Sequence, residues 1–123
     1  MKKILVIDDD LNIQEILENV LSELGYKIDL ASDGSQALKR INQDKPDLII
    51  MDIRLPDIDG ISLCRQIRQL KETSEMPILM LTALSDLTTY HDAKLFGAVD
   101  YIVKPFDLDL LREKIEKILF LPE

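Results

Sequence analysis

The chain has 123 residues, of which 46% are hydrophobic and 31% charged, as in a globular domain long enough for one core and too short for two. The formal net charge of −8 argues against nucleic acid or an anionic membrane as a direct partner. Cys64 is the only cysteine, so no internal disulfide can form, and we expect a reducing compartment, the cytoplasm.

The first apolar run, residues 4–7, follows two lysines and briefly resembles the start of a signal peptide. Asp8, Asp9 and Asp10 end the run after four residues, far short of a signal core or a membrane span. An amphipathic helix is predicted next, with Asp10 as its N-cap and Gly25 as its stop. Its apolar positions are Ile13, Ile16, Leu17, Val20, Leu21 and Leu24.

The alternation of strand and helix patterns continues to the end of the chain. Strands are predicted over residues 27–31, 48–51, 78–81 and 99–103, and a further helix over residues 86–96. Helical spacing also connects three groups of apolar positions: Ala37, Leu38 and Ile41; Ile61, Cys64, Ile67 and Leu70; Leu108, Leu111, Ile115 and Ile118. We therefore expect one α/β domain over residues 1–123, a doubly wound (βα)5 fold with a parallel sheet and helices on both faces.

Polar side chains stand where four of the five predicted strands end. Asp52 follows Leu48–Met51, an unbroken apolar run typical of a strand buried on both faces. The other strand-end residues are Asp8, Asp9, Thr82 and Lys104. Because ligands of open α/β sheets bind at the carboxyl ends of the strands, these side chains are placed for chemistry.

Three carboxylates brought together repel one another unless a cation lies between them. Mg²⁺ suits such oxygen ligands, with Mn²⁺ as a possible substitute, and the absence of a Cys/His cluster argues against zinc. Lys104 and Thr82 would neutralise charge on a transferring phosphoryl group, while Asp52 can attack phosphorus to form an acyl phosphate. The set predicts phosphoryl transfer onto Asp52.

Five short motifs extend this interpretation to a family. They are Val6-Ile-Asp-Asp-Asp10, Ile50-Met-Asp-Ile-Arg-Leu-Pro-Asp57, Asp59-Gly60, Leu81-Thr-Ala83 and Tyr101-Ile-Val-Lys-Pro-Phe106. Together they resemble the receiver domains of bacterial two-component response regulators in residue types, order and spacing. The resemblance spans nearly the whole chain and implies the strand order 2-1-3-4-5.

The resemblance also implies residue roles. Asp52 would accept a phosphoryl group from a sensor histidine kinase or a histidine phosphotransfer protein. Asp9, Asp52 and the backbone carbonyl of Arg54 would bind Mg²⁺ directly, and Asp8 would act mainly through metal-bound water. Thr82 and Lys104 would hold the phosphoryl oxygens. The protein would then be a signalling switch rather than an enzyme in the usual sense, catalysing its own phosphorylation and dephosphorylation.

Further implied features concern how the signal is read and how long it lasts. Thr82 and Tyr101 would form the switch, and the Lys104–Pro105 peptide bond would be cis. An output partner or a second copy would bind within residues 86–119, through a face that includes Tyr90, Lys94, Leu95 and Tyr101. Arg54 and Leu84 border the path of the hydrolytic water, and since Leu84 cannot hydrogen-bond it, we expect slow self-dephosphorylation.

Ordinary structural roles for single residues, and other classes of protein, are alternatives to this interpretation. Asp10 fits a helix cap better than a third metal ligand, Asp57 and Asp59 fit turns, His91 fits the surface and Cys64 fits the core. A flavodoxin-like carrier would need a phosphate loop in place of three aspartates. A small Mg²⁺-dependent phosphatase with an aspartyl nucleophile is chemically closer, and a receiver-like scaffold that is never phosphorylated is the third alternative.

Overall fold

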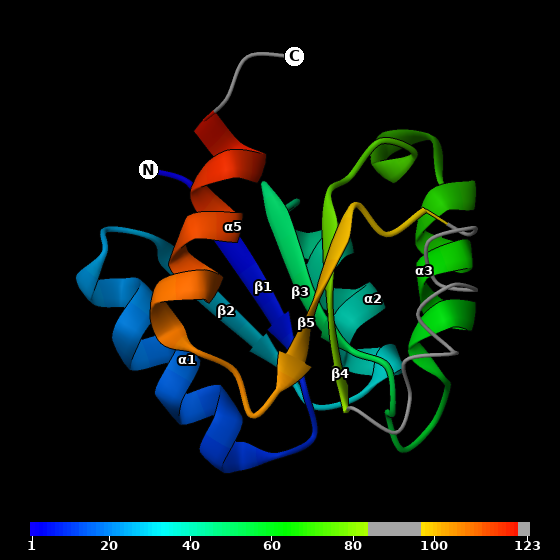
Figure 1. The fold of residues 1–123 in the computed structure, drawn as a ribbon. Coiled ribbons are helices and arrows are strands. Elements are labelled where there is room, and N and C mark those ends of the chain that lie inside the picture. The colour runs from blue at the N-terminus through cyan, green and yellow to red at the C-terminus, as the bar shows by residue number, and fades with distance from the viewer. Residues whose placement is uncertain (84–96, 121–123) are drawn as a thin grey trace.

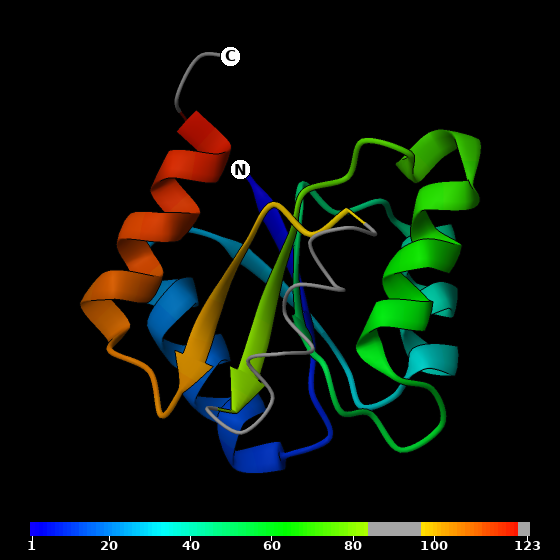
Figure 2. The same ribbon diagram turned by 45° about the vertical axis from the view of Figure 1, so that its right-hand side comes forward.

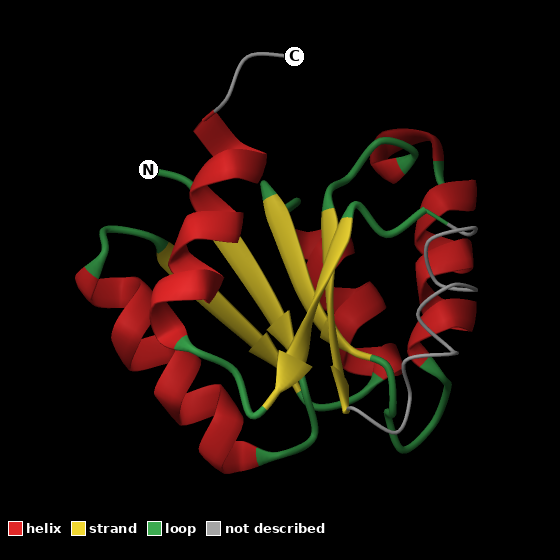
Figure 3. Ribbon diagram, in the orientation of Figure 1, coloured by secondary structure: helices red, strands yellow, loops and turns green. Residues whose placement is uncertain are grey.

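A computed structural model describes residues 1–83 and 97–120 of the chain. The strands are β1 (Lys3–Ile7), β2 (Lys27–Ala31), β3 (Leu48–Asp52), β4 (Ile78–Ala83) and β5 (Asp100–Lys104). The helices are α1 (Leu11–Glu23), α2 (Gly34–Gln43), α3 (Gly60–Gln69) and α5 (Leu108–Phe120), with a short 3₁₀ turn, η1 (Lys71–Thr73) (Figures 1 and 3). Each predicted strand is confirmed to within two residues, whereas the helix expected over residues 86–96 lies outside the described residues.

The five strands form one parallel sheet in the order β2-β1-β3-β4-β5, as the resemblance implies. The register aligns Val6 of β1 with Ile50 of β3, and Ile50 with Leu79 of β4. All strands therefore end at the same edge of the sheet, where the arrowheads gather in Figure 1. This shared edge brings together side chains that are up to 96 residues apart in the sequence.

Helices cover both faces of the sheet. Helices α1 and α5 lie together on one face, and α2 and α3 lie on the other (Figures 1 and 2). Alternate residues of each strand point to opposite faces, which divides the core into two layers. The layer under α1 and α5 contains Ile4, Val6, Leu48, Ile50, Leu79 and Leu81. The layer under α2 and α3 contains Leu5, Ile7, Ile49, Met51, Ile78 and Met80, together with buried Cys64.

Helices α1, α2 and α3 each begin at an aspartate that caps the helix. Asp10 accepts hydrogen bonds from the backbone N–H groups of Asn12 and Ile13, which supports its prediction as a cap. Asp33 caps α2, and Asp59 caps α3 rather than only shaping a turn. At the other end of α1, Gly25 has φ +95°, the left-handed conformation expected of a glycine stop.

Four residues placed on apolar helix stripes are more exposed than the sequence predicts, among them Leu24, which is 40% exposed. The others are Ile16 (44%), Leu70 (42%) and Leu108 (39%), so the expectation that these four residues face the core is wrong. The buried stripe of α1 consists instead of Gln14, Leu17 and Leu21. A polar residue thus occupies a position on the inner face of the helix.

Within the described ranges, no helix is both long and apolar enough to cross a bilayer.

Candidate functional site

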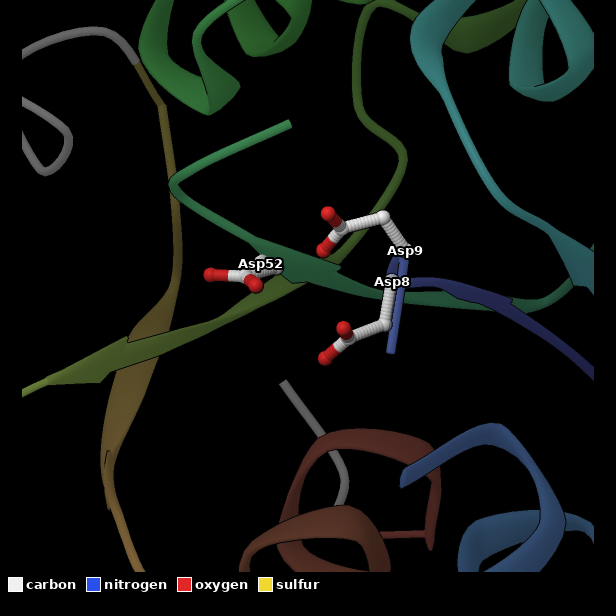
Figure 4. A group of neighbouring side chains, drawn as sticks. All are labelled: Asp8, Asp9 and Asp52. Carbon is white, nitrogen blue, oxygen red and sulfur yellow. The ribbon is translucent and has the colours of Figure 1, made fainter. Parts of the chain in front are cut away.

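The polar strand-end residues predicted from the sequence meet at the carboxyl edge of the sheet. Asp8 and Asp9 follow β1, Asp52 ends β3, and Lys104 ends β5. Ligand atoms of Asp8, Asp9 and Asp52 lie within 4.8 Å of one another, and Figure 4 shows the three carboxylates side by side at the ends of their strands. The convergence follows from the topology, since β1 and β3 are neighbours in a parallel sheet.

Lys104 connects the two strands of this acidic group. Its Nζ atom lies 2.8 Å from Asp8 Oδ2 and 3.1 Å from Asp52 Oδ2. The Asp8 side chain is completely buried, those of Asp52 and Lys104 are 14% and 23% exposed, and Asp9 is exposed. One ammonium group therefore offsets two carboxylates that would otherwise repel each other in a poorly solvated position.

The protonation equilibria of the pair reflect this arrangement. Burial, the largest influence, raises the pKa of the Asp8 carboxyl above its usual value, against the hydrogen bonds from Lys104 and Asp10. Burial alone would lower the pKa of Lys104, but its hydrogen bonds to Asp8 and Asp52 and their negative charges raise it overall. Lys104 therefore stays charged at neutral pH, and Asp8 is a carboxylate whose ionised form depends on a nearby cation.

The donor set suits a hard divalent cation. It consists of carboxylate oxygens from Asp8, Asp9 and Asp52, and Mg²⁺ prefers oxygen ligands and keeps several of its waters. Asp10 is not part of this group, because its carboxylate is occupied with the first turn of α1. The residues present therefore fit a magnesium site built from Asp8, Asp9 and Asp52.

The β3–α3 loop, residues 53–59, holds Asp52 in place. The backbone N–H of Arg54 donates to Asp52 Oδ1 at 3.1 Å, and Arg54 forms an isolated antiparallel bridge with Asp59. Gly60 then passes so close to β3 that an added Cβ would lie 2.7 Å from the Asp52 carbonyl oxygen and 2.8 Å from Ile53 Cα. Only glycine permits this approach, which explains its place in the Asp59-Gly60 motif.

The remaining predicted site residues lie on β4 and β5. Thr82 is fully buried, and its hydroxyl donates to the Ala83 carbonyl at 3.2 Å. Tyr101 is half-buried, with the Lys114 Nζ atom 5.7 Å from its ring centroid. The Lys104–Pro105 peptide bond is cis, as the resemblance implies. Leu84, Tyr90, His91, Lys94 and Leu95, for which lifetime, surface or partner roles are predicted, lie outside the described residues.

Two residues that the sequence did not connect with the site support it, and one of them, Asp57, was predicted only as a turn residue. The buried Gln14 side chain donates to the carbonyl oxygen of Asp8, and the exposed Asp57 carboxylate accepts from the backbone at the start of α2. Gln14 carries one detectable signal, because it lies three and seven residues before Leu17 and Leu21 on the inner stripe of α1. Asp57 carries none, because its partners precede it by more than twenty residues.

Comparison with known proteins agrees with the family resemblance found in the sequence. A family model described as the response regulator receiver domain matches residues 4–116. The probable transcriptional regulator ycf27 of Guillardia theta is 42% identical over 118 residues, which are 96% of this chain and 45% of that protein. The alkaline phosphatase synthesis transcriptional regulatory protein PhoP of Bacillus subtilis is 43% identical over 118 residues, or 96% of this chain and 48% of that protein. The chain spans about half the length of these curated relatives.

Solved structures resemble the whole domain. A two-component response regulator from Clostridium difficile superimposes with a TM-score of 0.90 at 36% identity, covering 97% of this chain and 96% of that one. The chemotaxis response regulator CheY4 of Vibrio cholerae has a TM-score of 0.91 at 30% identity, covering 97% and 99% of the two chains.

Proposed function

The chain belongs to the response regulator receiver domain family of two-component signalling, and on that premise we propose that Asp52 is its phosphoacceptor. The phosphoryl group would come from a phosphohistidine of a sensor kinase or a histidine phosphotransfer protein. Asp8, Asp9, Asp52 and the Arg54 carbonyl would hold Mg²⁺ or Mn²⁺. The observation that carries the proposal is the lysine shared by two carboxylates, since a cation set between Asp8 and Asp52 can also meet a phosphoryl oxygen.

The transfer exchanges one bond to phosphorus for another. An Asp52 carboxylate oxygen attacks phosphorus as the phosphorus–nitrogen bond to the donor imidazole breaks, and the imidazole leaves with the electron pair of that bond and takes up a proton. Bound Mg²⁺ would supply positive charge to the carboxylates and the phosphoryl oxygens. Lys104 moves from two carboxylate partners to a phosphoryl oxygen, and the buried Thr82 hydroxyl donates to another.

Release of the signal and its output rest on the same residues. Water attack on the acyl phosphate would return Asp52 to its starting state, slowly if Arg54 and Leu84 border the water's path as the sequence predicts. Phosphorylation would shift a two-state equilibrium through Thr82 and Tyr101. Exposed Val99 and Leu110 lie on the segments that flank Tyr101 along the chain, which supports an output partner or a second copy binding there.

Uptake of one phosphoryl group tests the proposal. We expect incubation with acetyl phosphate and Mg²⁺ to add the mass of a single phosphoryl group to the intact protein. Little should be added when EDTA replaces Mg²⁺, because the crowded carboxylates would then repel the donor. Equal uptake with and without the metal, or no uptake from any small phosphodonor, would contradict the proposal.

Metal binding should be visible as stability. Mg²⁺ at 100 times its dissociation constant would stabilise the folded state by about 2.7 kcal/mol and raise the melting temperature by several degrees. Asp9→Ala should stabilise the metal-free protein, because one repelling charge is removed, and should reduce the Mg²⁺ effect. Asp10→Asn is the matched control: it removes the neighbouring charge, keeps the helix cap and should leave the Mg²⁺ effect in place. A melting curve unchanged by millimolar Mg²⁺ would count against the site.

A further inference from the structure

The β2–α2 turn, residues 31–35, touches both backbone segments from which the proposed metal ligands project. It contributes no carboxylate to the group of Asp8, Asp9 and Asp52. One side of the turn accepts hydrogen bonds from Gln14 of α1, whose side chain also reaches Asp8 just after β1. The other side donates to Asp57, on the β3–α3 loop. The two ligand-bearing segments are therefore tied to one common support.

Gln14 makes the first connection. Its Nε2 atom lies 2.6 Å from the Asp8 carbonyl oxygen, 3.3 Å from the Ala31 carbonyl oxygen and 3.0 Å from Ser32 Oγ. The Ala31 carbonyl also accepts from the backbone N–H of Asp8 at 3.0 Å, so the β1–β2 pairing continues to the first residue of the acidic group. Because Gln14 is buried, no bulk water replaces these donors at the point where Asp8 and Asp9 leave the strand.

Asp57 makes the second connection. Its two carboxylate oxygens accept from the backbone N–H groups of Gly34 at 2.8 Å and Ser35 at 3.0 Å. The contact is close as well as polar, since a Cβ on Gly34 would collide with Ile58 and lie 3.3 Å from Asp57 Oδ1. The loop that carries Arg54 is thereby held against the first turn of α2.

We propose that Gln14 and Asp57 are positioning residues that set the Mg²⁺ affinity of the acidic site by anchoring its two ligand-bearing segments to the β2–α2 turn. This inference rests on the proposed magnesium site. Outer groups that orient metal ligands commonly change affinity by about 10- to 100-fold when they are removed. A residue that only supported the fold would change stability and leave the dissociation constant alone.

Calorimetric titration of Mg²⁺ into wild type, Gln14→Met and Thr73→Val tests the first anchor. Methionine keeps the length of the side chain, removes both donors and changes no charge. We expect about tenfold weaker Mg²⁺ binding by Gln14→Met. Thr73 is the control, since it is also buried and donates to the Ile67 carbonyl of α3. It lies in η1, on the segment that leads into β4 at the end of the strand opposite the site. Thr73→Val should lower the melting temperature and keep the wild-type affinity.

The second anchor is tested with a pair of charge-matched variants. Asp57→Asn places an amide donor against the donors of α2, whereas Asp33→Asn removes an equal charge from the same helix end and keeps its cap. Asp57 is exposed, so its variant should fold even if Gln14→Met does not. We expect weaker Mg²⁺ binding by Asp57→Asn than by Asp33→Asn. Wild-type affinity in a folded Gln14→Met, or equal affinity in the two asparagine variants, would overturn the inference, while a wild type that binds no Mg²⁺ would overturn the proposed site itself.

Discussion

Asp52→Asn should take up no phosphoryl group from acetyl phosphate under conditions in which the wild type is fully modified. Asparagine keeps an oxygen that can accept from the Arg54 N–H, and Lys104 keeps its 2.8 Å contact with Asp8. The variant should therefore fold, with a free energy of unfolding within about 1 kcal/mol of the wild type. The loss would then be chemical, because an uncharged amide is a poor nucleophile toward phosphorus. Intact mass and urea unfolding of the same sample measure both quantities.

A second aspartate–lysine pair provides the control for Asp52→Asn. Asp100 Oδ2 lies 2.8 Å from Lys114 Nζ at the start of β5, away from the edge where the strands end. Asp100→Asn removes a paired carboxylate of the same type and should leave phosphoryl uptake at the wild-type level. Full uptake by Asp52→Asn, or a loss of uptake in both variants, would contradict the assignment of the phosphoacceptor.

Lys104→Met should destabilise the metal-free protein strongly at neutral pH. Asp8 would remain completely buried and lose its cation, next to a second carboxylate. We expect a loss of about 2–3 kcal/mol in the free energy of unfolding, below the roughly 3–5 kcal/mol typical of a fully buried pair because Lys104 is partly exposed. Urea unfolding in the presence of EDTA measures it.

The difference in the free energy of unfolding between Lys104→Met and wild type should become smaller at acidic pH. The folded pKa of Asp8 is already raised, so between its unfolded and folded pKa values the folded state binds more protons and stability grows as pH falls. Loss of Lys104 raises that folded pKa further, which moves the upper limit of this window toward neutral pH. As the pH falls below neutral, the variant should therefore regain more stability than the wild type.

Lys114→Met is the matched control for Lys104→Met. The two lysine side chains are equally exposed, at 23%, but the partner of Lys114 is 36% exposed where Asp8 is fully buried. Its loss should cost only about 0–1 kcal/mol. Equal losses in the two variants, or a Lys104→Met deficit that does not change with pH, would show that burial of Asp8 is not the cause.

The sequence predicts the sheet better than it predicts which helix residues face it. Apolar runs such as Leu48–Met51 are buried on both faces, so the central strands β1, β3 and β4 are marked by composition alone. On α1 the apolar residues cover more than one face, and their spacing does not decide which edge of the stripe packs inward. Ile16 therefore emerges at the surface while Gln14 turns in. The contacts of the sheet decide this, and they are not local in sequence.

The site could be predicted where it depends on strand ends and not where it depends on long side chains or distant loops. Parallel strands share one carboxyl edge, so Asp8, Asp9 and Asp52 had to approach one another. The simultaneous contact of Lys104 with two carboxylates depends on the path of a flexible side chain. The Asp57 contact with α2 depends on how two loops pack, and no sequence pattern in either loop predicts that packing.

Chemical mapping of the phosphoryl group tests directly whether Asp52 is the phosphoacceptor. Borohydride reduces an acyl phosphate to an alcohol, so an aspartyl phosphate becomes homoserine and keeps a permanent mass label after digestion. The protein should be incubated with acetyl phosphate and Mg²⁺, reduced, digested and sequenced by mass spectrometry. We predict homoserine at position 52 alone, and only in the sample that contained Mg²⁺. Homoserine at position 8 or 9, or an unmodified position 52 in phosphorylated protein, would show that Asp52 is not the phosphoacceptor.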